Sequence, residues 1–190
     1  PEPRNDYETF SQAPDFQYLT GFAEPDAAMV MVVRAGEPQA SMLFVQPNDP
    51  AREVWTGKRA GVQGATAATG IPARPVRELR PVLDSLAATG HPFAVVGKFG
   101  GGEIRTRDEQ LVDALRKARP ELKVMRATGL VARLRGTKSA AELARIRRAV
   151  DVTVRAHREA LALVAPGLNE FEVQALVEYT FRRNGAEWPS

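Results

Sequence analysis

The pattern of apolar and polar positions predicts a β-hairpin near the start of the chain. Residues 27–34 and 40–46 are apolar segments of strand length, and residues 35–39 between them contain Gly and Pro. This arrangement is typical of an antiparallel hairpin. Residues 27–34 are apolar on both faces, which predicts a central strand covered by helices on either side.

A short turn rich in large side chains, within residues 15–25, precedes the hairpin. Gly21 is expected to end this helical turn, and Glu24 with Pro25 leads into the first strand. Large apolar side chains at such spacing pack into a core far more often than they bind a ligand. The stretch is therefore predicted to help form the core of a domain.

Helices and strands alternate further along the chain. We expect a helix over residues 76–88, a strand over 92–96, a helix over 106–118 and a strand over 122–125. This mixture predicts an α/β layer arrangement with helices flanking a mixed sheet.

Two segments, residues 97–102 and residues 47–64, are predicted to be loops. Residues 97–102 are rich in glycine, but Phe99 follows Lys98 where a phosphate loop requires Ser or Thr, so a flexible loop is expected. Residues 47–64 are predicted to form a loop that carries Trp55. Trp55 either caps the edge of a core or contacts a ligand or partner, because loops on a rigid scaffold often carry binding residues.

The last third of the chain predicts a long helix followed by a shorter one. Ser139 and Glu142 have the spacing of a capping box. Apolar residues then recur at intervals of three and four, with a histidine expected among the core positions: Leu143, Ile146, Val150, Val154, His157, Leu161 and Val164. At 1.5 Å per residue this helix is about 40 Å long, more than a compact first domain needs.

A second helix is predicted to begin after Asn169, with Glu172 completing another capping box. Two helices cannot close a core by themselves. We therefore expect two domains, residues 1–135 and residues 136–190, of which the second is truncated.

Composition narrows the possible functions. The chain has no cysteine, which excludes disulfides and thiolate metal sites and favours a cytoplasmic location, and its two histidines are far apart in the sequence. Its longest apolar run is seven residues, and its N-terminus shows no secretory signal, so no membrane association is expected. The net charge of +3 comes from interspersed charges and does not predict nucleic-acid binding.

Five segments together resemble the N-terminal half of an Xaa-Pro aminopeptidase (aminopeptidase P) of the creatinase and prolidase family. They are residues 4–6, 14–25, 53–61, 138–149 and 183–190. Ser11 and the pair Ala13 and Pro14 depart from the family pattern, which bears on the subfamily. The resemblance implies an N-terminal creatinase-like domain with a ribonuclease-H-like motif, followed by the opening helices of an incomplete pita-bread α+β domain.

The resemblance also implies a function. Family enzymes hold a pair of divalent metals, commonly manganese, and release the N-terminal residue that precedes a proline. Their metal ligands lie beyond Ser190, so this chain is predicted to contain no catalytic or metal-binding residue and to be inactive alone. The chain would shape the substrate cleft and build a homo-oligomer, either a dimer or a tetramer. Trp55 would bind substrate at an active site, which in one arrangement belongs to a neighbouring subunit.

Two alternatives stay open. The chain could belong to a non-catalytic interaction or regulatory module that shares the creatinase-like fold. Within the enzymes, a dipeptidase specific for Xaa-Pro or a creatine-type hydrolase has the same N-terminal pattern.

Overall fold

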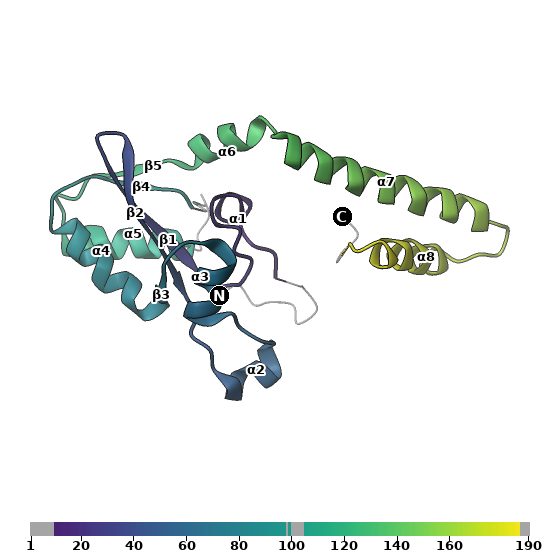
Figure 1. Ribbon diagram of the computed structural model, residues 1–190, viewed down its shortest axis with the longest axis horizontal. Helices are drawn as coiled ribbons and strands as arrows, with labels where there is room; N and C mark the ends of the chain where they lie inside the picture. Colours follow the sequence, from purple (N-terminus) through teal and green to yellow (C-terminus); the bar gives the residue numbers. More distant parts are fainter. Residues whose placement is uncertain (1–9, 98, 100–104, 187–190) are drawn as a thin grey trace. The chain divides into compact units, whose positions relative to one another are not determined.

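The computed structural model describes residues 10–97, 99 and 105–186. Its contacts divide the chain into two compact units, one ending at Arg135 and the other beginning at Gly136 (Figure 1). Each unit is described by itself. No helix in the described ranges combines the length and the apolar character needed to cross a membrane.

The first unit contains two small sheets (Figure 1). In the three-stranded sheet, β2 (Glu37–Val45) lies between β1 (Ala28–Arg34), which is antiparallel to it, and β3 (Ala73–Pro75), which is parallel to it. In the second sheet, β4 (Phe93–Val95) pairs in parallel with β5 (Val124–Arg126). The predicted mixed α/β architecture is thus confirmed at this level.

The helices of this unit include both of those predicted from periodicity. The helix expected over 76–88 is the 3-10 turn η1 (Val76–Glu78) continued by α4 (Leu79–Ala87), and that expected over 106–118 is α5 (Arg107–Ala118). α1 (Pro14–Thr20) is the predicted aromatic turn, which Gly21 ends in the left-handed conformation. Three more helices were not predicted: α2 (Pro50–Thr56), α3 (Gly61–Thr69) and α6 (Thr128–Gly136).

The hairpin turn is shorter than the sequence predicted. Only Ala35 and Gly36 form it, with φ of +51° and +84°, and the expected turn residue Pro38 lies within β2, opposite Val33. A proline is tolerated there because β3 pairs only with residues from Leu43 onward, so no strand needs its missing N–H on that side. The register shift beside Val33 absorbs the irregularity.

The prediction of a central β1 is wrong. β1 is the edge strand of its sheet, and Met31 and Val33 near its end are 47% and 54% exposed. The first half of the strand does pack on both faces, since Met29 contacts one core cluster and Val30 the other. The strand buried most completely is β2, the central one.

Two clusters form the core of the first unit. One joins Phe22 to Leu43 and Val45 of β2 and to Ala65 of α3, with Phe16 packed against it. The other joins α4, α5 and the residues before β5: Leu83, Ala87, Leu115 and Leu122. The prediction that the aromatic turn helps build a core is therefore confirmed for Phe16 and Phe22.

The second unit is a pair of helices, α7 (Ala140–Leu163) and α8 (Glu170–Arg183), which lie side by side (Figure 1). Both predicted capping boxes are present, Ser139 with Glu142 and Asn169 with Glu172. The reciprocal hydrogen bonds satisfy backbone N–H groups that the first turn leaves unpaired.

The contact between α7 and α8 does not use the apolar series of α7. Ala156 and Ala160 are the buried residues of α7, and they face Thr180 and Phe181 of α8, which are also buried. Small residues four apart let two helices approach closely. The expected core position of His157 is wrong, because His157 is exposed, and so are the six other members of the series: Leu143, Ile146, Val150, Val154, Leu161 and Val164. We call these six residues the α7 stripe.

Candidate functional site

Trp55 is the predicted site residue, and it lies at the end of a short helix and not in an irregular loop. It is 88% exposed on α2, beside Val54, which is 80% exposed. Trp55 belongs to neither of the two core clusters described above. An exposed side chain of this size is available for contact with a ligand or partner, and the substrate role of Trp55 stays a prediction.

The two ends of the segment that carries Trp55 lie next to each other. The side-chain amide of Asn48 donates a hydrogen bond to the carbonyl oxygen of Arg59, at 2.7 Å. Gly61 follows with φ of +61°, and a Cβ atom at Gly61 would lie 1.6 Å from Asn48 Oδ1. Both the backbone angle and the close approach therefore require glycine at position 61.

The aromatic turn reaches this segment through Glu24. Glu24 Oε1 accepts a hydrogen bond from the backbone N–H of Ala60 at 2.7 Å. The backbone carbonyl of Glu24 in turn accepts one from the side chain of Gln12 at 2.8 Å. Two segments singled out in the sequence, residues 14–25 and 53–61, are thus bonded to each other.

Sequence reasoning missed the role of Glu24. Glu24 belongs to the segment 15–25, whose large side chains attracted attention, and its bonding partner Ala60 lies 36 positions further along the chain. A run of Glu and Pro after a glycine indicates only a strand entrance. No local spacing rule links a carboxylate to a backbone N–H so far away, and only the fold brings the two together.

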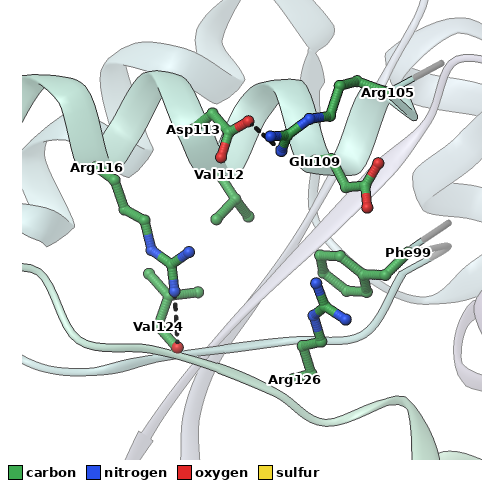
Figure 2. A pocket seen from close by; sticks show the side chains of 8 residues that line it. All are labelled: Phe99, Arg105, Glu109, Val112, Asp113, Arg116, Val124 and Arg126. Atoms are coloured by element: carbon green, nitrogen blue, oxygen red, sulfur yellow. Dashed lines mark hydrogen bonds and ion pairs between the residues drawn. The ribbon is translucent and has the colours of Figure 1, made fainter. Parts of the chain in front are cut away.

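A shallow pocket of about 60 Å³ lies between α5 and β5 (Figure 2). It is lined by Phe99, Arg105, Glu109, Val112, Asp113, Arg116, Val124 and Arg126. Arg105 pairs with Asp113 at 2.6 Å, and Arg116 donates to the carbonyl oxygen of Val124 at 3.2 Å. 

The other two charged groups of this pocket are also engaged. Arg126 lies over the ring of Phe99, 4.7 Å from its centroid, and buried Glu109 accepts a hydrogen bond from the backbone N–H of Thr106 in the capping box of α5. The charged groups of the pocket thus serve the local structure and do not converge on a common point. The expected glycine loop beside it, residues 97–102, lies mostly outside the described residues.

Polar side chains link the two helices of the second unit, and Arg155 of α7 donates a hydrogen bond to Asn184, which ends α8, at 2.8 Å. Glu159 of α7 accepts hydrogen bonds from the hydroxyl of buried Thr180 and from Arg183, both at 2.6 Å. The hydrogen bond from Thr180, aided by the positive charge of Arg183, holds the pKa of Glu159 below its usual value. These three side chains link α7 to α8.

A metal site needs several donor side chains close together. Within 10–97, 99 and 105–186, no three His, Asp or Glu side chains come together in a group that could hold a metal ion. The resemblance places the ligands of the metal pair beyond Ser190, and that placement stays a prediction.

Residues 2–95 match the family model described as aminopeptidase P, N-terminal domain. The mouse Xaa-Pro aminopeptidase 3 is 35% identical over 185 residues, which cover 94% of this chain and 36% of the relative. The Escherichia coli Xaa-Pro aminopeptidase is 28% identical over 191 residues, covering 95% of this chain and 42% of the relative.

Solved structures give the same result. Aminopeptidase P from Escherichia coli, in its low-pH form, matches 96% of this chain with a TM-score of 0.81 and 27% identity. Aminopeptidase PepP from Pseudomonas aeruginosa matches 96% with a TM-score of 0.76 and 32% identity. In both cases the match covers 42% of the solved chain, so this chain spans less than half the length of the relatives it matches. The chain belongs to the aminopeptidase P family and corresponds to the N-terminal portion of its members.

Proposed function

We propose that this chain is the N-terminal portion of a metal-dependent aminopeptidase that releases the N-terminal residue preceding a proline. The relatives named Xaa-Pro aminopeptidase match nearly the whole chain, which supports this assignment. In this proposal residues 1–135 form the creatinase-like domain with its ribonuclease-H-like motif. Residues 136–190 open the pita-bread catalytic domain, and the enzyme works in the cytoplasm.

The α7 stripe supports the assignment of the second unit. Its six apolar side chains are 40% to 76% exposed, although α7 is already packed against α8 on another face. Leaving so much apolar surface in water is unfavourable by roughly 25 cal/mol for each Å². We assign the cover of this stripe to the remaining part of the catalytic domain.

The exposed indole of Trp55 is the observation that carries the proposed role of the first unit. A peptide bond to proline has no N–H, and the pyrrolidine ring presents an apolar face. A flat aromatic side chain offers a matching apolar surface without requiring a hydrogen-bond donor. Trp55 is therefore proposed to bind substrate, in a homo-oligomer whose neighbouring subunit supplies the catalytic groups.

The divalent metal pair, proposed to be manganese, belongs in this scheme to the part of the catalytic domain that follows the chain. When bound, such a pair supplies an activated hydroxide and polarises a carbonyl. The 190 residues by themselves are proposed to be inactive. Their contribution is to present Trp55, to shape the substrate end of the cleft and to build the oligomer.

The test uses the full-length protein loaded with manganese and an Xaa-Pro-Yaa tripeptide. We expect release of the first residue, and Trp55→Ala should lower kcat/KM by about tenfold, the cost of losing one well-packed aromatic contact. Leu130→Ala removes another exposed apolar side chain, on α6, and should change nothing.

Two outcomes would contradict the proposal. If no divalent metal supports release of the first residue, the protein is better explained as a non-catalytic interaction or regulatory module. If Trp55→Ala leaves both the kinetics and the oligomeric state unchanged, the substrate role of Trp55 is wrong.

A further inference from the structure

The loop that carries Trp55 is closed at its base. Residues 49–60 leave the core after Asn48 and return to it at Gly61, where the two ends touch. Such compact surface loops with neighbouring ends are frequently functional. The base is held on both sides, whereas the tip, Val54 and Trp55, is almost fully exposed.

Asn48 closes one side of the base. Its side-chain amide bonds to the carbonyl oxygen of Arg59, and its Oδ1 sits where only a glycine at position 61 leaves room. This contact joins the start of the loop to its end, 11 residues later. The outgoing part of the loop, which contains α2, therefore cannot move independently of the returning part.

Glu24 closes the other side and fastens the base to the core. Its carboxylate accepts the Ala60 N–H at 2.7 Å, a charge-assisted hydrogen bond. Phe22, two residues before Glu24, is buried in the first core cluster, and Ala60 packs against that same cluster. Both ends of this hydrogen bond are thus attached to rigid structure.

We infer that Glu24 and Asn48 are positioning residues, forming a clamp that fixes the loop 49–60 so that Trp55 is presented in its binding conformation before substrate arrives. This inference rests on the proposed substrate role of Trp55. Ordering a loop at the moment of binding costs conformational entropy, and a loop that is ordered on folding has already met that cost. The clamp converts an exposed indole into a preorganised contact.

The experiment compares Glu24 variants in the full-length enzyme. Glu24→Ala removes the acceptor, Glu24→Asp keeps the charge on a shorter side chain, and Glu24→Gln keeps an acceptor oxygen at the same reach. We expect Glu24→Ala and Glu24→Asp to raise KM roughly 3- to 10-fold with kcat within about twofold, the effect of one lost hydrogen bond. Glu24→Gln should retain most of the wild-type KM.

Two controls separate positioning from general damage. Glu37→Ala removes an exposed glutamate from the hairpin and should leave KM unchanged. In a Trp55→Ala background, Glu24→Ala should raise KM by less than about twofold more, because the side chain it positions is gone. If Glu24→Ala instead multiplies KM by the same factor in both backgrounds, the clamp does not act through Trp55 and the inference is wrong.

Hydrogen exchange of the segment 48–61 gives a readout that does not depend on activity. Glu24→Ala, and Asn48→Asp as a second variant of nearly unchanged shape, should speed exchange in this segment while the melting temperature stays close to wild type. Unchanged exchange in both variants overturns the clamp. Faster exchange together with a kinetically silent Trp55→Ala overturns only the proposed substrate role of Trp55 and leaves the clamp standing.

Discussion

The hydroxyl of Thr180 on α8 donates a hydrogen bond to Glu159 Oε2 on α7 at 2.6 Å, and Thr180 itself is fully buried. Because this bond stabilises the ionised carboxylate, the pKa of Glu159 in the folded protein is lower than in the unfolded chain. The stabilisation is therefore fully present above the unfolded pKa of about 4.5 and is lost as the pH falls through the lower, folded pKa.

We predict that the α7–α8 contact weakens in acid for this reason. A carboxyl titration by NMR should place the pKa of Glu159 below its usual value, and Thr180→Val should raise it. The unfolding free energy of Glu159→Gln should depend less on pH than that of the wild type below about pH 4.5. An unshifted Glu159 pKa in the wild type would contradict this account.

A second prediction concerns Asp15 on α1 and Arg135 at the end of α6. Their side chains pair at 2.7 Å across 120 positions of sequence, and the Asp15 side chain is only 16% exposed. A double-mutant cycle with Asp15→Asn and Arg135→Gln should give a coupling free energy of about 1 kcal/mol. Arg133→Ala, which removes an exposed arginine two residues away, is the control and should have no effect.

Substitutions at the two residues of the hairpin turn are predicted to change the free energy of unfolding in opposite directions. Ala35 has φ of +51°, a left-handed conformation that disfavours a Cβ atom, and Gly36 has φ of +84°. Ala35→Asn should raise the unfolding free energy by roughly 0.5 to 1 kcal/mol, because Asn tolerates this region. Gly36→Ala should lower it by about 1 kcal/mol although no atom lies in the way of the new Cβ. Chemical denaturation of the two variants would check both signs.

A substitution in the α7 stripe is predicted to affect stability differently in the 190-residue chain and in the full-length protein. Val150 is 53% exposed here, so Val150→Glu in the 190-residue chain should change stability by no more than about 0.5 kcal/mol. In the full-length protein, where the proposed cover buries it, the same change should cost on the order of 2 kcal/mol or more. Arg147→Ala, which removes an exposed arginine from the same helix, should change the stability of the 190-residue chain and of the full-length protein by the same amount. An equal effect of Val150→Glu in both proteins would contradict the proposed cover.

The elements with strong local signals were predictable from sequence. Ser139 with Glu142 and Asn169 with Glu172 placed the starts of α7 and α8, because a capping box needs only residues three apart. The hairpin followed from two apolar runs, although Pro38 suggested too long a turn. In each case the information lay within a few residues.

The remainder depended on contacts distant in sequence. α3 was missed because its residues are mostly small and its glycines indicate a loop, yet Ala65 is fully buried against β2. The apolar series on α7 is present as predicted, but the expected core position of His157 was wrong, since the buried residues of α7 are Ala156 and Ala160. Trp55 could be named as a candidate from its side chain alone. The hydrogen bonds of Glu24 and Asn48 that hold its loop could not be predicted, because no spacing rule connects these residues to their partners.

The uncovered face of α7 has a consequence for how such a protein is made. The ribosome synthesises α7 before the larger part of a chain as long as the relatives, at about 5 to 20 residues per second. For on the order of tens of seconds the nascent helix carries its six apolar side chains in water with nothing to bury them. Exposed apolar surface of this kind makes unfinished chains prone to aggregation, so we expect α7 to be a place where a chaperone or a second nascent chain can attach during synthesis.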